Sequence, residues 1–221
     1  HDAGELARAE YHYRIGLSLA TELGHKGTML RGLRAQGWIE RDRGMFGPAR
    51  KSFDKALRLA RASGHLAEVG AMLGSLAHNL VMEGDYPGAV VASEEAIEIG
   101  VAIGNRRLEG LARGNRAGMF IEMGRDGAAE REMLRAIDLL KDGHRIAVCV
   151  YSAQLAMLLG RRGEFDRAEV MIAAAESEVR ASHSKENLGV VLIALARFRL
   201  SQGKSKEAQA ALDEAEDLRV Q

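Results

Sequence analysis

The chain has 221 residues, of which 47% are hydrophobic and 28% are charged, so its composition is that of a globular protein and not of a disordered one. Its single cysteine excludes a disulfide framework and any zinc site built from several cysteines. Lys and Arg together number 31, as do Asp and Glu, so no net positive charge favours nucleic acid or a membrane surface as a partner.

Apolar residues recur at helical spacing along the whole chain, and glycines punctuate the pattern. No apolar run approaches the roughly 20 residues that a membrane-spanning helix needs. The pattern predicts helices, in chain order, over 5–23, 27–43, 46–63, 67–83, 86–103, 107–123, 126–141, 145–161, 165–180, 186–202 and 205–219.

A repeat of 39 or 40 residues underlies these helices. One set of marker glycines carries it: Gly4, Gly44, Gly84, Gly124, Gly163 and Gly203. Five residues after each marker stands an alanine, and further columns at fixed distances from the marker contain only Ala or Gly. Small residues at a constant phase indicate helices that pack too closely for a larger side chain. Each marker glycine is expected to end a helix in the left-handed conformation.

Two stretches carry a family resemblance: Gly-Asp-Tyr-x-x-Ala at 84–89 and Gly-Glu-Phe-x-x-Ala at 163–168. With the alanine seven residues after each, they resemble the tetratricopeptide repeat (TPR). The period of about 40 residues, longer than the usual 34, is similar to the long-helix variety found in bacterial signalling proteins such as MalT-like transcription activators. The resemblance implies an all-α solenoid, a right-handed superhelix of antiparallel helix pairs with about 11 helices.

The phase of the repeat also predicts the domain organisation. We expect a single TPR-like domain over 1–221, with a partial repeat at 1–25 and repeats at 26–65, 66–105, 106–144, 145–184 and 185–221. The last repeat has no polar capping helix after it, which leaves Leu200 and Leu212 near an open edge. We therefore expect either a fragment of a longer protein or self-association through the uncapped terminal repeats.

The resemblance implies that the first helix of each pair lines a concave groove that binds a peptide or protein segment. The only Trp of the chain falls there, at Trp38, among three arginines, which favours an acidic or C-terminal peptide segment or an anionic small molecule as partner. The alternative is a partly buried Trp38 with solvated arginines. By phase, the expected groove residues are Arg31, Arg34, Trp38, Arg41, Ser75, His78, Met82, Asn115, Glu122, Gln154, Met157, Arg161 and Arg197.

Arg113 and Arg116 stand at positions where the preceding repeat has leucines. Burial of an unpaired arginine is costly, so each should find a carboxylate, with Glu94, Glu95, Glu98 and Glu109 near enough in the repeat. The alternative interpretation is a buried anion site in the third repeat.

The residues that could carry catalysis or hold a metal lack suitable partners. His25, His65 and His144 fall in equivalent turns of different repeats, too far apart to share one ion. Cys149 has no histidine close to it in the sequence, and no phosphate-binding loop, HExxH or GxSxG motif is present. We expect no enzymatic activity, no cofactor and no bound metal.

The sequence therefore predicts a cytoplasmic protein- or peptide-binding scaffold or sensor, part of a bacterial multidomain signalling or regulatory protein. The alternative is a small-molecule effector-binding regulatory domain resembling MalT. A continuous open lining favours a peptide, whereas a closed pocket beside Trp38 or Arg116 favours a metabolite.

Overall fold

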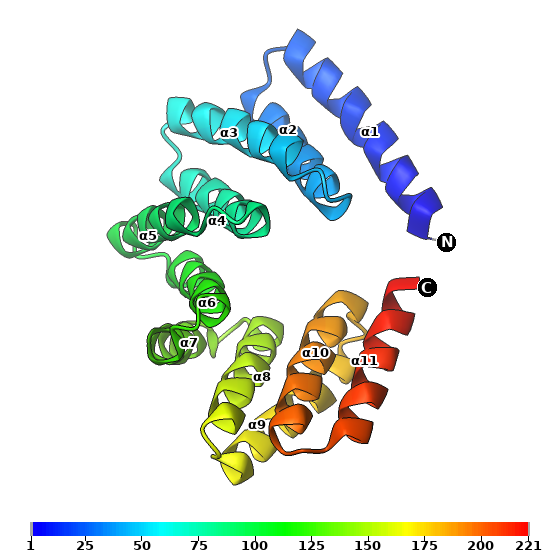
Figure 1. The fold of residues 1–221 in the computed structure, drawn as a ribbon. Helices are drawn as coiled ribbons and strands as arrows, with labels where there is room; N and C mark the ends of the chain where they lie inside the picture. The colour runs from blue at the N-terminus through cyan, green and yellow to red at the C-terminus, as the bar shows by residue number, and fades with distance from the viewer. Residues whose placement is uncertain (1, 221) are drawn as a thin grey trace. The chain divides into compact units, whose positions relative to one another are not determined.

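The computed structural model describes the backbone of residues 2–220 and the side chains of residues 11–185 and 187–218. These residues form helices throughout, with no strand in the described part (Figure 1). The all-α prediction and its helix boundaries are confirmed to within a few residues. The helices are α1 Asp2–Glu22, α2 Lys26–Asp42, α3 Phe46–Ser63, α4 Leu66–Glu83, α5 Tyr86–Ala102, α6 Arg106–Glu122, α7 Asp126–Leu140, α8 Arg145–Arg161, α9 Phe165–Ala181, α10 Lys185–Ser201 and α11 Ser205–Val220.

The turn between α4 and α5 shows how the marker residues divide the helices. Gly84 ends α4 in the left-handed conformation with a φ of 84°. The carboxylate of Asp85 then caps α5 by accepting a hydrogen bond from the Gly88 backbone N–H at 3.0 Å. Pro87 lies in the first turn of α5, where its missing N–H costs no helical hydrogen bond. Positive φ values are also found at Gly44, Gly124, Gly163 and Gly203, which confirms the predicted caps there. Gly4 differs from the prediction, because it lies inside α1 and ends no helix.

The chain divides into two compact units between Met119 and Phe120, inside α6. Unit 1 contains α1 to α5 and the first part of α6, and unit 2 contains the rest of α6 and α7 to α11. The expectation of one domain over the whole chain stays a prediction.

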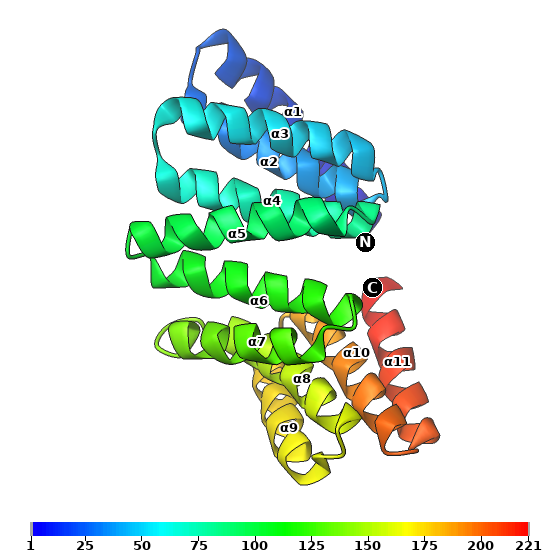
Figure 2. The same cartoon turned by 60° about the vertical axis from the view of Figure 1, so that its left-hand side comes forward.

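Unit 1 is held together by close contacts between successive helices, seen side by side in Figure 2. The ring of Phe53 on α3 lies directly over Gly37 on α2, where a Cβ would come within 2.6 Å of the ring. The backbone of Glu109 on α6 approaches Gly100 on α5 just as closely, since a Cβ there would lie 2.7 Å from its nitrogen. The Gly37 contact confirms that its column of Ala and Gly marks a close helix crossing, and Gly100 shows a second close crossing outside the columns.

In unit 2 the first helices of consecutive pairs, α8 and α10, pack against each other extensively. A Cβ at Gly160 on α8 would lie 2.5 Å from the ring of Phe198 on α10. Ion pairs tie other helices of this unit, including Arg162 to Glu130 at 2.6 Å and Arg145 to Glu178 at 2.8 Å. Across the described residues, no helix combines the length and the apolar character that crossing a membrane would require.

Candidate functional site

The strongest candidate site lies on α2 in unit 1, around Trp38. The Trp38 side chain is prominent on the surface, since 40% of the residue is exposed. The guanidinium carbon of Arg34 lies 5.0 Å from the centre of the Trp38 ring, which is a cation–π contact. Arg31 donates to the Thr28 hydroxyl at 3.4 Å. Within the described residues, neither Arg31 nor Arg34 forms an ion pair with a carboxylate, so both remain available to an anion.

A cavity of about 280 Å³ opens beside Trp38, between α1 and α2. It is smaller than the roughly 300–1,000 Å³ of typical small-molecule pockets, so it suits one side chain or a small anion better than a whole metabolite. The Nε atom of Arg34 is buried and makes no hydrogen bond. The cavity is lined by His12, Tyr13, Gly16, Leu17, Thr28, Arg31, Gly32, Arg34, Ala35 and Trp38.

Sequence reasoning missed His12 and Tyr13, because it assigned α1 to the second-helix class and gave it no part in the groove. Tyr13 occupies the same repeat position as Phe53, nine residues after the marker glycine. Phe53 is fully buried beneath α2, whereas Tyr13 is 44% exposed because no described helix precedes α1. The aromatic residue that both repeats carry at this position is the sequence signal that could have drawn attention to Tyr13.

The lining continues from α2 to α4. An Nη atom of Arg41 lies 3.4 Å from Nδ1 of His78, and Arg41 also pairs with Asp42 at 2.9 Å. Desolvation of the imidazole and the charge of Arg41 lower the pKa of His78, with Asp42 acting in the opposite sense. Met82 is exposed further along α4, and the Ser75 hydroxyl donates to the Ala71 carbonyl at 3.3 Å.

In the third repeat, the structure places both core arginines next to carboxylates. Arg113 lies 2.8 Å from Glu109, and Arg116 lies 3.8 Å from Glu94. Both arginine side chains are largely buried, so these contacts fit the ion-pair interpretation better than an open anion site. Asn115, between them in the sequence, is exposed.

Among the expected groove residues of unit 2, one lies in the core and two arginines form ion pairs at the surface. The repeat phase places Met157 in the groove, but the structure places it in the core. Only 3% of the residue is exposed, because α10 packs closely on α8 at this point. Arg161 pairs with Asp126 at 3.2 Å and Arg197 with Glu122 at 3.4 Å, so both arginines already have anionic partners. The Oε1 atom of Gln154 is buried without a hydrogen bond.

Other titratable groups have structural roles. The imidazole of His25 caps α2 by accepting from the Thr28 backbone N–H. His65 and His144 hold the equivalent positions before α4 and α8, but their side chains make no capping hydrogen bond. Burial raises the pKa of the Cys149 thiol, with Glu178 adding to the effect and Arg145 opposing it. The described residues contain no group of three or more His, Cys, Asp or Glu side chains that could hold a metal ion.

No protein-family model matches the chain, and no curated protein matches it. Several solved structures match the chain in fold. BtubC (BKLC) from P. vanneervenii superposes with a TM-score of 0.72 at 19% identity, covering 97% of this chain and 91% of that one. A Podosopora anserina kinesin light chain with nearly identical TPR-like repeats gives 0.61 at 15% identity, covering 86% and 95%. The chain has the TPR-like helical-repeat fold.

A third TPR-like neighbour is aspartyl phosphate phosphatase F from Bacillus subtilis. It gives a TM-score of 0.73 at 12% identity and covers 98% of this chain and 68% of that one. At these identities the likeness concerns the fold alone. It confirms the resemblance to TPR proteins read from the sequence, while the narrower likeness to MalT stays a prediction.

Proposed function

We propose that this chain is a protein- or peptide-binding module whose Trp38 site in unit 1 takes an acidic segment of its partner. The observation that carries the proposal is the pair of arginines, Arg31 and Arg34, that flank an exposed Trp without a carboxylate partner among the described residues. In unit 2, by contrast, the two arginines expected in the groove, Arg161 and Arg197, are already paired with carboxylates.

The chemistry of the site favours a carboxylate ligand. Arginine binds carboxylates through two parallel hydrogen bonds, and the indole ring offers a flat surface to the apolar part of the same side chain or its neighbour. A buried donor without a hydrogen bond costs about 1–3 kcal/mol, so a ligand that accepts from the Arg34 guanidinium recovers part of that cost. The cavity next to Trp38 has room for one such side chain.

We propose binding and not catalysis as the function. The site brings together arginines and an aromatic ring, which recognise charge and shape. The Thr28 hydroxyl in its lining lies 2.9 Å from Nδ1 of His25, but that imidazole also caps α2 by accepting from the Thr28 backbone N–H, which is a structural role. The phosphatase named among the structural neighbours shares only the fold. A role as the sensor part of a cytoplasmic bacterial signalling protein, with the acidic partner as its input, completes the proposal.

The experiment is a titration of the chain with a short peptide rich in Glu and Asp, followed by Trp38 fluorescence. We expect saturable change in the emission, and an Arg34→Ala variant that weakens binding at least tenfold, which corresponds to about 1.4 kcal/mol. Arg58→Ala serves as the matched control, because Arg58 is an exposed arginine of α3 outside the cavity. Unmoved emission, or equal affinity in Arg34→Ala and the control, contradicts the proposal.

A second candidate function is the binding of a small-molecule effector. One observation favours it: a larger cavity, of about 690 Å³, lies between α1 and α2 and falls within the range of small-molecule pockets.

A further inference from the structure

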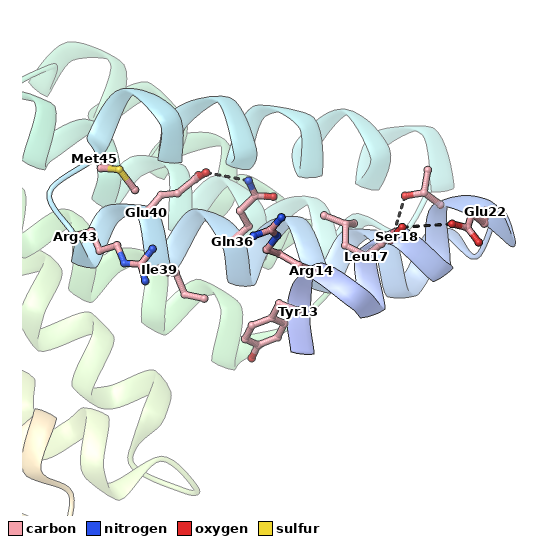
Figure 3. Close-up of a pocket in the computed structure, with 12 residues that line it drawn as sticks. Tyr13, Arg14, Leu17, Ser18, Glu22, Gln36, Ile39, Glu40, Arg43 and Met45 are labelled. Carbon is pink, nitrogen blue, oxygen red and sulfur yellow. Dashed lines mark hydrogen bonds between the residues drawn. The ribbon is translucent and has the colours of Figure 1, made fainter. Parts of the chain in front are cut away.

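The 690 Å³ cavity lies between α1 and α2 and reaches the turn before α3 (Figure 3). It is separate from the cavity beside Trp38. The two share Tyr13, Leu17 and Gly32. Leu17 and Gly32 touch where the helices meet, since a Cβ at Gly32 would lie 3.2 Å from Leu17. On α2, Gln36 and Glu40 face the larger cavity, whereas Arg31 and Trp38 face the smaller one.

The acidic groups of the larger cavity already have donors. One oxygen of Glu40 accepts from the Gln36 amide at 2.9 Å, and the other accepts from the Ser52 hydroxyl at 2.7 Å. Glu22, at the opposite end of the cavity, accepts from the Ser18 hydroxyl at 3.4 Å. Figure 3 shows the carboxylate of Glu40 turned toward Gln36 and that of Glu22 turned toward Ser18. Because both carboxylates already accept hydrogen bonds, they attract a cationic ligand less strongly.

Two hydrogen-bond donors of the cavity lack such partners among the described residues. Arg14 reaches from α1 toward Gln36 on α2 (Figure 3), and within the described residues it has no carboxylate partner. The Tyr13 hydroxyl also lines the cavity, and no acceptor for it is found among the described residues. A guanidinium and a phenol without acceptors create a preference for an anionic group.

Thr21 and Arg43 also line the cavity, and the rest of the wall is apolar and comes from both helices and the turn. Leu17 on α1, Ile39 on α2 and Met45 before α3 supply hydrophobic surface. An apolar chain placed against them would lose its contact with water, at about 25 cal/mol for each Å² buried. The lining thus combines an anion-binding group with a surface for a hydrocarbon tail.

We propose that this cavity binds a small organic anion with an apolar tail, such as a medium-chain carboxylate, with the head group at Arg14. Such a ligand bridges α1 and α2, so it stabilises the packing of α1 against α2 within unit 1. The proposal deepens the second candidate function and is independent of the peptide site at Trp38.

The test uses decanoate as the probe and hydrogen exchange of the backbone amides as the readout. We expect decanoate to slow exchange in residues 13–22 of α1 in a saturable manner. Arg14→Gln should raise the half-saturating concentration about tenfold, because it removes the charge and keeps most of the side-chain length. Arg58→Gln, on α3 outside the cavity, should leave that concentration unchanged.

Two further probes distinguish the head group from the tail. Decyltrimethylammonium has the same tail with a positive head group and should give no protection of α1, and acetate, which lacks the tail, should give none at the same concentrations. Absence of protection by decanoate overturns the proposal. So does equal protection by decyltrimethylammonium, or an unchanged half-saturating concentration in Arg14→Gln. The peptide titration at Trp38 is unaffected by any of these outcomes, so the two proposals fail separately.

Discussion

Arg41 in unit 1 and Gly160 in unit 2 occupy the same repeat position, three residues before the marker glycine, and produce opposite results. At Gly160 the absent side chain leaves room for Phe198, and α10 packs tightly on α8. At Arg41 a long side chain stands between α2 and α4 and reaches His78, and these helices make few contacts. At this repeat position, glycine accompanies a close contact between the first helices, and arginine accompanies an accessible surface between them.

The largest effect that sharpens this comparison should come from Phe198→Ala. Phe198 is fully buried between α8 and α10, so its truncation should lower the free energy of unfolding by about 3–5 kcal/mol. Trp38→Ala, at the exposed site of unit 1, should cost much less stability. Urea denaturation of both variants measures the difference, and a Trp38→Ala loss equal to that of Phe198→Ala would show that α2 has no open surface there.

A pair of glycine substitutions should give the next largest effect, with opposite signs. Gly160→Ala should destabilise by about 1–3 kcal/mol, because the new Cβ would lie 2.5 Å from the Phe198 ring and 2.8 Å from the Ser201 hydroxyl. Gly74→Ala, on α4 with no atom within 4 Å of its Cβ position, should stabilise by about 0.5–1 kcal/mol through helix propensity. Thermal unfolding of the two variants checks the signs, and a stabilised Gly160→Ala would refute the tight contact of α8 and α10.

The smallest effect concerns His78 and the pH dependence of stability. The folded-state pKa of His78 is lowered, so between that value and the ordinary 6.5 the unfolded chain binds the proton more readily. The protein should therefore lose stability as the pH falls below about 6.5, and His78→Gln should remove part of that loss. Denaturation at a series of pH values measures it, with the exposed His65→Gln as control. An identical loss in wild type and His78→Gln would argue against the burial of the His78 imidazole, which is the main cause of its lowered pKa.

Most of the fold could be predicted from the sequence because its signals are local and repeated. Marker glycines such as Gly84 fix the helix ends through their backbone conformation, and small residues such as Gly37 fix the helix crossings through steric contact. Both depend on the residue itself and on its phase in the repeat, and both can be read without coordinates.

Less of the candidate site could be predicted, because accessibility depends on partners elsewhere in the chain. The phase placed Trp38 and Met157 at equivalent positions, and only the packing of α10 on α8 shows that Met157 is buried. The sequence likewise does not show that Arg161 and Arg197 find carboxylates while Arg34 does not. The cavities beside α1 depend on how that helix diverges from α2, which no local signal records.

The central claim is that the open face of α2 and α4, and not the closed contact of α8 and α10, binds an acidic segment. The direct measurement is a titration of the isotope-labelled chain with the Glu- and Asp-rich peptide, followed by backbone amide chemical shifts. We predict the largest shifts at Arg31, Arg34 and Trp38, smaller shifts at His78, and unmoved signals around Phe198. Shifts concentrated on α8 and α10, with α2 unmoved, would contradict the account.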